Sequence, residues 1–246
     1  MDKELIRRFA LLFRGLEAAY GTFDITGKEA SGKHKGKARL VRGKRSLATF
    51  EKHLNGGQGV GIVPINEKNA CFFGAIDIDQ YPLDHAAIVK TVHRQKLPLV
   101  VCRSKSGGGH VYLFLKEAVP AEVLQNKLKE LASEIGCAAG TEIFPKQIQL
   151  VLERGDTGNF LNLPYFDHEN GLRYAFKEDG SAATLEEFVE MAEATAITPE
   201  ELEHLLEKET VEVDERLKNG PPCLQILLRQ GFPEGTRNNG LFNLGV

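Results

Sequence analysis

The chain has 246 residues, of which 42% are hydrophobic and 26% charged, the usual balance of a globular protein. No apolar run reaches the roughly 18 to 20 residues that span a bilayer, and the N-terminus lacks the cleavage site of a signal peptide, so we expect a cytoplasmic protein without a membrane partner. The four cysteines form no CxxC pair, which argues against a disulfide framework and against a zinc ribbon.

Charge is distributed unevenly along the chain, although the formal net charge is only -3. Residues 184–217 hold twelve acids against Lys208 and Arg216, a net of -10, so the remaining residues carry +7. Residues 28–45 alone carry eight basic side chains and one acid. This basic stretch is typical either of a segment that follows a phosphate backbone or of a solvated loop, and its composition does not decide between them.

Hydrophobic periodicity predicts a mixture of strands and helices in which tight turns as well as helices join neighbouring strands. This order favours an α+β fold over a doubly wound parallel sheet. The first 21 residues have the pattern of a charged amphipathic helix. The further expected strands are 58–65, 70–79, 98–104 and 110–115. The further expected helices are 46–57, 83–95, 120–136, 184–194 and 198–208, and a final short helix begins in 221–231.

Two aspartates, Asp77 and Asp79, close the apolar segment 70–79. Side chains two residues apart leave a strand on the same face, so these carboxylates converge and repel each other unless a cation lies between them. Carboxylate oxygens suit Mg²⁺ or Mn²⁺, which also take phosphate ligands. The pair therefore indicates a metal site for phosphate chemistry or, as the alternative, an acidic strand end that faces solvent.

A glycine-rich turn, SKSGGGH, lies between two expected strands. Its glycines allow the backbone to approach an anion, and Lys105, Ser106 and His110 could add donors to a triphosphate. A plain hairpin turn explains the same glycines, and a P-loop is excluded because no GKS or GKT follows. Further along, Glu142 could be a third metal ligand, with Lys146 neutralising phosphate; a surface Glu–Lys pair is the alternative.

The six other histidines have no spacing for zinc, and neither an HxH pair nor HExxH occurs. This absence argues against a zinc hydrolase and against an HUH-type nicking enzyme. We interpret these side chains as surface or structural groups: His34, His53, His85, His93, His168 and His204.

The order of these motifs resembles the archaeo-eukaryotic primase superfamily, in particular the primase-polymerase domains of phages, plasmids and transposon-linked TOTE conflict systems. The resemblance spans residues 10–170 and is carried by FFGAIDID, RSKSGGGHVYLFL, EIFPKQ and GNFLNLPYF. It implies an RRM-like sheet and an N-terminal α/β unit that form a cleft. Three glycines separate Ser106 from His110 where many relatives have one residue, and the third acid is Glu rather than the commoner Asp.

The resemblance also implies roles for matched positions. Asp77, Asp79 and Glu142 would hold two Mg²⁺ or Mn²⁺ ions, and Ser106 and His110 would bind the phosphates of the incoming nucleotide, with Lys105 and Lys146 beside them. The implied activity is joining of NTPs or dNTPs on a single-stranded DNA template with a primer, in replication of a mobile element or phage, with a helicase as a further partner.

Two other functions remain open on the sequence. One is a non-catalytic module that binds single-stranded nucleic acid and keeps the fold. The other is a DxD transferase acting on nucleotide sugars, for which the Ser and His of the turn have no obvious use. For the domains, we expect a catalytic core over residues 1–180, an acidic helical extension packed on it over 181–219, and the start of a further helical segment over 220–246.

Overall fold

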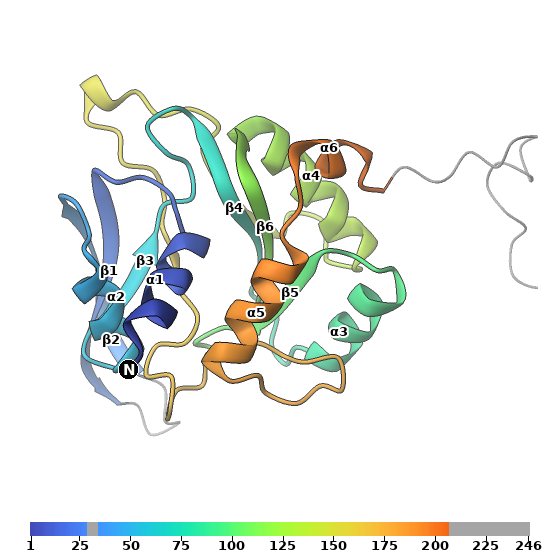
Figure 1. Ribbon diagram of the computed structural model, residues 1–246, viewed down its shortest axis with the longest axis horizontal. Coiled ribbons are helices and arrows are strands. Elements are labelled where there is room, and N and C mark those ends of the chain that lie inside the picture. The colour runs from blue at the N-terminus through green and yellow to red at the C-terminus, as the bar shows by residue number, and fades with distance from the viewer. Residues whose placement is uncertain (29–33, 207–246) are drawn as a thin grey trace, which may run out of the picture. The chain divides into compact units, whose positions relative to one another are not determined.

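The computed structural model describes residues 1–28 and 34–206 (Figure 1). Residues 1–202 form one compact unit, and a second unit begins at Glu203. The segment expected at 220–246 lies outside the described residues, and the expected domain boundary at residue 180 stays a prediction. Among the described residues, no helix is long and apolar enough to cross a membrane.

The described residues form an α+β fold with two antiparallel four-stranded sheets and six α-helices. Sheet 1 has the strand order β2-β1-β3-β8, and sheet 2 has the order β5-β6-β4-β7. The strands are β1 (Ala19–Lys28), β2 (His34–Arg42), β3 (Gly59–Ile62), β4 (Ala70–Ile78), β5 (Leu99–Arg103), β6 (Gly109–Pro120), β7 (Glu142–Phe144) and β8 (Leu161–Asn162). The helices are α1 (Lys3–Leu12), α2 (Leu47–Leu54), α3 (His85–Arg94), α4 (Ala121–Glu134), α5 (Leu185–Thr195) and α6 (Pro199–His204), and Leu152–Arg154 forms a 3₁₀ turn.

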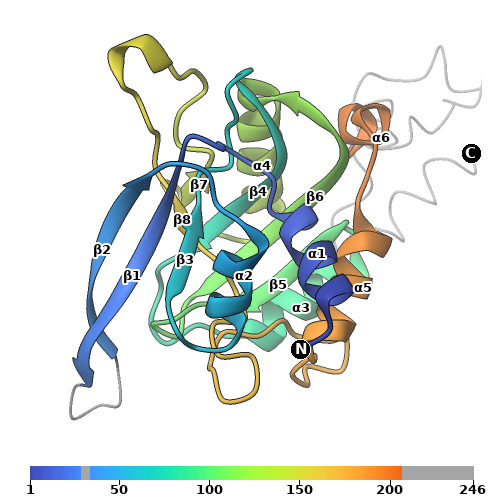
Figure 2. The same cartoon turned by 60° about the vertical axis from the view of Figure 1, so that its left-hand side comes forward.

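Sheet 2 is built as a β-α-β-β-α-β unit, β4-α3-β5-β6-α4-β7, with its first strand in the interior of the sheet. Adjacent β4 side chains point to opposite faces: a Cβ on Gly74 would meet Leu124 and Leu128 of α4, whereas Phe73 packs on Phe13 just after α1. Figures 1 and 2 show α3 and α4 on one side of the sheet and α1 with α5 on the other. The turn-joined strands and the α+β class are as predicted.

A cluster of aromatic rings packs between sheet 2 and the helices α1 and α5. Phe13 lies at its centre, with ring centroids 5.2 Å from Phe73, 5.5 Å from Tyr112 and 5.6 Å from Phe114. Helix α5 closes the cluster through Phe188, 6.2 Å from Phe13. Truncation of a buried Phe typically costs roughly 3 to 5 kcal/mol of folding free energy, so this cluster contributes strongly to the stability of the unit.

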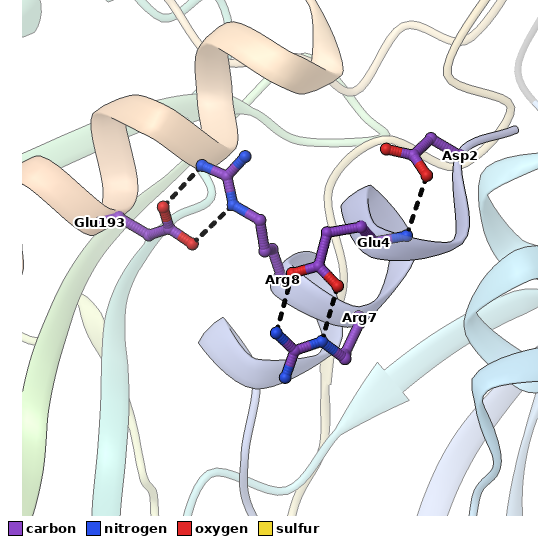
Figure 3. Close-up of polar contacts among 5 residues, drawn as sticks. All are labelled: Asp2, Glu4, Arg7, Arg8 and Glu193. Carbon is purple, nitrogen blue, oxygen red and sulfur yellow. Dashed lines mark hydrogen bonds and ion pairs between the residues drawn. The ribbon is translucent and has the colours of Figure 1, made fainter.

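Helix α1 is fixed at its start and at its side by polar contacts (Figure 3). The Asp2 carboxylate accepts a hydrogen bond from the Glu4 backbone N–H at 3.0 Å, which caps the helix. Arg7 donates two hydrogen bonds to Glu4, both 2.8 Å long. Arg8 of α1 donates a bidentate pair of hydrogen bonds, 3.0 and 2.6 Å long, to the Glu193 carboxylate of α5. Two helices far apart in the sequence are thereby joined at the surface of the unit.

The first helix is shorter than its amphipathic pattern predicts, because it ends at Leu12 rather than near residue 21. The Leu16 N–H donates instead to the carbonyl of Val63, at 3.0 Å. Gly15 permits this approach, since a Cβ at this position would lie 2.1 Å from the same carbonyl oxygen. The backbone contact with the Val63 segment therefore replaces the last helical turns.

The acidic stretch supplies α5 and α6, as its pattern predicts. Both begin with a capping box, in which Thr184 and Glu187, and then Thr198 and Glu201, bond each other's backbone N–H groups. The buried face of α5 consists of Leu185, Phe188, Val189 and Ala192. The acids of α5 thus lie on a helix whose other face belongs to the core.

Candidate active site

Strand pairing brings three of the predicted site residues into one line across sheet 2. Asp77 of β4 lies opposite His110 of β6 on one side and opposite Glu142 of β7 on the other. Residues directly opposite in an antiparallel pair project from the same face, with Cβ atoms roughly 4.5 to 5.5 Å apart. We call Asp77, His110 and Glu142 the strand row. The sequence predicted its members but not that they are neighbours on adjacent strands.

Within the strand row, Asp77 and His110 are partly buried and in contact. The His110 Nε2 atom lies 3.4 Å from Asp77 Oδ1, and the two side chains are 12% and 14% exposed. The other ring nitrogen, Nδ1, lies 3.1 Å from the hydroxyl of Tyr112. His110 is therefore held at both ring nitrogens, one by a carboxylate and one by a buried phenol.

Glu142 occupies the more exposed end of the strand row. Its carboxylate lies 2.6 Å from the ammonium of Lys146, the pair that the sequence placed together. The ammonium also lies 5.1 Å from the centre of the Phe144 ring. Both residues line a hollow of about 440 Å³, together with Gln125, Lys129, Gly140, Thr141 and Ile143. Asp77 and His110 are not part of this lining.

The second aspartate, Asp79, has a different environment, because it lies beyond the last residue of β4. Its carboxylate accepts a hydrogen bond of 2.8 Å from the hydroxyl of Tyr81. The Ser106 side chain hydrogen-bonds the same phenol. Burial, followed by the hydrogen bond to Asp79, raises the pKa of Tyr81. We call these exposed residues, Asp79, Tyr81 and Ser106, the turn cluster; the sequence analysis did not single out Tyr81, two positions after Asp79.

The glycine-rich turn is tight rather than open. The Ser104 N–H donates to the carbonyl of Gly108 at 2.8 Å, and His85 Nε2 lies 2.9 Å from the same oxygen. A Cβ on Gly108 would lie 2.3 Å from the carbonyl oxygen of Ile78, and Gly107 has φ +94°. The glycines therefore let the turn lie directly against the end of β4. His85, interpreted from sequence as surface or structural, supports this turn.

Lys105 reaches away from the strand row to the other sheet. Its ammonium lies 3.3 Å from the centre of the Phe23 ring on β1, a cation–π contact between a turn of sheet 2 and sheet 1. The basic stretch that follows Phe23 along the chain forms the end of β1 and the strand β2. Its residues 29–33 lie outside the described part, and its predicted contact with a template stays a prediction.

The segment GNFLNLP supplies the edge strand β8 of sheet 1. The Asn162 carbonyl accepts a hydrogen bond of 3.4 Å from the Tyr112 hydroxyl, so β8 meets the strand row through this phenol. The Asn162 side-chain oxygen is buried and has no hydrogen-bond partner among the described residues. Asn159 is bonded to Gln147 through its backbone N–H, at 3.0 Å, and through its side chain.

The three predicted acidic ligands are not gathered around one point. Within residues 1–28 and 34–206, no three His, Cys, Asp or Glu side chains are grouped as a metal site. The donor chemistry nevertheless suits a divalent cation, because Asp77 and Glu142 present hard oxygen ligands from opposed positions. Like charges directly opposite destabilise a sheet, and the Lys146 ammonium offsets the charge of Glu142 here. Asp79 uses Oδ1 to accept from Tyr81, so Oδ2 is the oxygen that could serve as a third ligand.

His53 has a structural role, as the sequence predicted for histidines outside the glycine-rich turn. His53 is fully buried and bridges two segments: the Val60 N–H donates to Nδ1 at 3.0 Å, so Nε2 carries the proton and donates to the Pro164 carbonyl at 2.8 Å. Burial lowers the pKa of His53 to about 3. Cys71 and Cys102 are likewise buried, and burial raises the pKa of Cys71 to about 12, so both are inert core residues.

Residues 28–205 match the family model described as TOTE conflict system, Archaeo-Eukaryotic Primase domain. The chain belongs to this family. The family match includes the whole strand row, the turn cluster and Lys105, whereas α1 and most of β1 precede it. The resemblance expected from the order of the motifs is thereby confirmed.

Solved structures similar to this chain include the AEP domain of the cyanophage S-2L primase-polymerase, with 14% identity and a TM-score of 0.40 over 78% of this chain and 98% of that one. Primase RepB′ is similar at 14% identity with a TM-score of 0.38, over 78% of this chain and 62% of the RepB′ chain. The catalytic domain of RepB′ in complex with initiator DNA is similar at 14% identity with a TM-score of 0.38, over 84% of this chain and 98% of that domain. A search of curated proteins finds no match.

Proposed function

We propose that this protein is a template-dependent nucleotidyltransferase, a DNA primase or DNA polymerase, that joins NTPs or dNTPs on single-stranded DNA. Membership of the primase family supports the class of reaction. The observation that carries the proposal is the strand row, in which two carboxylates and a histidine lie side by side on three adjacent strands. This row provides ligands for a cation and a donor for phosphate on the same face of one sheet.

In this proposal Asp77, Asp79 and Glu142 hold Mg²⁺ or Mn²⁺. When bound, such ions would lower the pKa of the attacking 3′-hydroxyl and neutralise charge on the leaving pyrophosphate. The hydroxyl oxygen forms a bond to the α-phosphorus of the incoming nucleotide while the bond to the pyrophosphate oxygen breaks. The carboxylates of Asp77 and Glu142 begin this process already opposed to each other across the sheet, so little rearrangement of backbone is needed.

The triphosphate is the proposed ligand of the neighbouring donors. His110 presents Nε2 beside Asp77, and the Lys146 ammonium lies beside Glu142, so each acid of the strand row has a nitrogen group next to it that can turn to phosphate. Ser106 would add its hydroxyl and Lys105 its ammonium from the turn. Preorganised donors of this kind stabilise the charge that moves onto pyrophosphate during the reaction.

We infer that template and primer lie between an RRM-like unit, sheet 2 with α3 and α4, and an N-terminal α/β unit that includes sheet 1. The strand order of sheet 2 and the Lys105–Phe23 contact between the sheets support this arrangement. The basic side chains of β2 are the proposed contact for the template backbone. Replication of a mobile element or phage in a prokaryotic cytoplasm, together with a helicase, is the proposed setting.

The proposal is tested by incorporation of labelled nucleotides on a primed and on an unprimed single-stranded template, with NTPs and dNTPs supplied separately and with Mg²⁺ or Mn²⁺. Product of template-defined sequence is expected, and it should disappear when the metal is removed with a chelator. The control for Asp77→Asn is Glu117→Gln, since Glu117 is an exposed acid on β6 outside the strand row. Glu117→Gln should retain full synthesis.

Absence of synthesis from every template, or synthesis that Asp77→Asn does not reduce, would reject the nucleotidyltransferase. Salt-dependent binding of single-stranded DNA that ignores both metal and nucleotide would then favour the non-catalytic binding module. Transfer from a nucleotide sugar, measured in the same metals, would favour the DxD transferase.

A further inference from the structure

Tyr112 is a core residue whose hydroxyl reaches the strand row. Its side chain is fully buried, and its ring lies 5.5 Å from Phe13 and 5.8 Å from Phe114. Residues two apart in a strand share a face, so Tyr112 follows His110 along the same side of β6. The rings fix the direction of the phenol, and its oxygen ends 3.1 Å from His110 Nδ1.

The same hydroxyl is bonded on its other side by sheet 1. It donates to the backbone carbonyl of Asn162 at 3.4 Å, and this residue belongs to β8. Since β8 pairs with β3, the phenol oxygen is located by both sheets at once. A buried hydroxyl needs a partner, and a carbonyl alone would satisfy it; the additional contact with a histidine at the candidate site calls for a further explanation.

The contact with Tyr112 gives the two ring nitrogens of His110 different partners. Nδ1 is occupied by Tyr112, and Nε2 is the nitrogen that points to Asp77, 3.4 Å from its carboxylate. The phenol has one proton, which it donates to the Asn162 carbonyl, so it accepts from Nδ1–H of His110 and fixes the ring through its oxygen; Nε2 can donate to phosphate when it carries a proton as well. Without this contact the imidazole could rotate about its Cβ–Cγ bond and turn Nε2 away from the face that carries Asp77.

We propose that Tyr112 is a positioning residue of the nucleotide site, whose hydroxyl fixes the ring of His110 so that Nε2 is presented to the triphosphate. This inference rests on the proposed function, because it takes His110 as a phosphate contact. It deepens that function by assigning a role to a residue that touches neither the nucleotide nor the reacting atoms. Tyr112 acts through His110 alone.

The test removes one oxygen atom. Tyr112→Phe keeps the ring in the aromatic cluster and deletes the contact with Nδ1. The matched control is Tyr165→Phe, because Tyr165 is also buried and its hydroxyl also makes two hydrogen bonds, to the Ala183 carbonyl at 2.9 Å and from the Ala175 N–H at 3.0 Å, but neither partner belongs to the strand row or the turn cluster. Both variants should melt below the wild-type protein, so a thermal shift alone does not separate the two roles.

Binding of the nucleotide does separate them. We expect Tyr112→Phe to weaken the binding of ATP and dATP, measured by calorimetry with Ca²⁺, about fivefold, the usual effect of one hydrogen bond. Binding of adenosine should not change, because it has no phosphate for His110. In synthesis, the KM for the nucleotide should rise by a similar factor while kcat falls less than twofold. Tyr165→Phe should leave all these quantities at the wild-type value.

A double-mutant cycle shows whether Tyr112 acts through His110. In the His110→Ala background, Tyr112→Phe should cause no further loss of affinity. Additive losses, an effect on adenosine equal to that on ATP, or an unchanged affinity in Tyr112→Phe would overturn the positioning role. If the wild type binds ATP but makes no product, the proposed activity fails while the cycle still decides the role of Tyr112. If the wild type binds no triphosphate, both proposals fail.

Discussion

The strand row and the turn cluster contain the two aspartates of one DxD motif, yet they place them in contrasting environments. Asp77 is partly buried, has neighbours on two adjacent strands and contacts His110, whose other ring nitrogen is hydrogen-bonded to Tyr112. Asp79 is exposed and bonded to Tyr81, two residues away. Although the two aspartates are only two positions apart, pairing in the sheet determines the place of Asp77, whereas a local turn determines the place of Asp79.

This difference indicates which part of the site is ready for ligand. The strand row cannot shift without changing the register of β4, β6 or β7, because a slip of one residue would turn its side chains to the other face. The turn cluster is held by exposed hydrogen bonds for which water competes. We therefore expect ligand to find the strand row in place and to rearrange the turn cluster.

The largest expected effect comes from exchanging the two aspartates for asparagine one at a time. Asp77→Asn should lower kcat/KM for nucleotide incorporation by about 10³-fold, the upper range for loss of one group that stabilises transition-state charge. Asp79→Asn should cost about tenfold less, because water can replace an exposed ligand. Primer extension under initial-rate conditions measures both, with Glu117→Gln as the reference. Equal losses would show that ligand organises the turn cluster as firmly as the strand row.

The next effect concerns the point where the turn meets the strand. Gly108→Ala should lower the free energy of unfolding by about 2 to 3 kcal/mol, since its Cβ would collide with the Ile78 carbonyl and push the turn from β4. Gly107→Ala should cost only about 1 kcal/mol, because there the penalty is the positive φ and not a collision. Urea denaturation gives both values. The opposite ranking would mean that the turn is free of β4.

The smallest expected effect is a pH dependence of the free energy of unfolding that comes from His53, a structural histidine, in contrast to His110 of the strand row. Burial lowers the pKa of His53 to about 3 from the 6.5 of an unfolded chain, so the unfolded state binds the proton more readily. The contribution of neutral His53 to the free energy of unfolding is therefore fully present above about pH 6.5 and is lost as the pH falls from there toward 3. Between pH 7 and pH 5 we expect a loss of about 2 kcal/mol. Urea titrations of the wild type and of His53→Gln should show that the variant lacks this part of the pH dependence.

Much of the site could be predicted from the sequence because its signals are local. The apolar run before Asp77, the glycines before His110 and the spacing of Glu142 from Lys146 each lie within one segment. Strand register across three segments depends on how β4, β6 and β7 pack, and no local pattern encodes it. For this reason the order Glu142, Asp77, His110 across the sheet became visible only in the structure.

The residues missed by the sequence analysis share this cause. Tyr112 reads as one aromatic in an apolar strand, HVYLFL, and nothing near it shows that its hydroxyl will meet Asn162, 50 residues later. The early end of α1 likewise depends on the Val63 carbonyl, which competes for the Leu16 N–H. In each case a long-range partner overrode or completed a local preference.

The joining of α1 to α5 has a consequence for how the chain reaches this structure. Arg8 and Glu193 are 185 positions apart, and Phe9 and Phe188 meet across a similar interval, with ring centroids 6.1 Å apart. On a ribosome, the first helix is made long before the helix that covers it. Because closing so long a loop delays the contacts that reward it, the aromatic cluster is completed late and folding is slow for a unit of this size. Until then, the apolar face of α1 remains exposed to other chains and to chaperones.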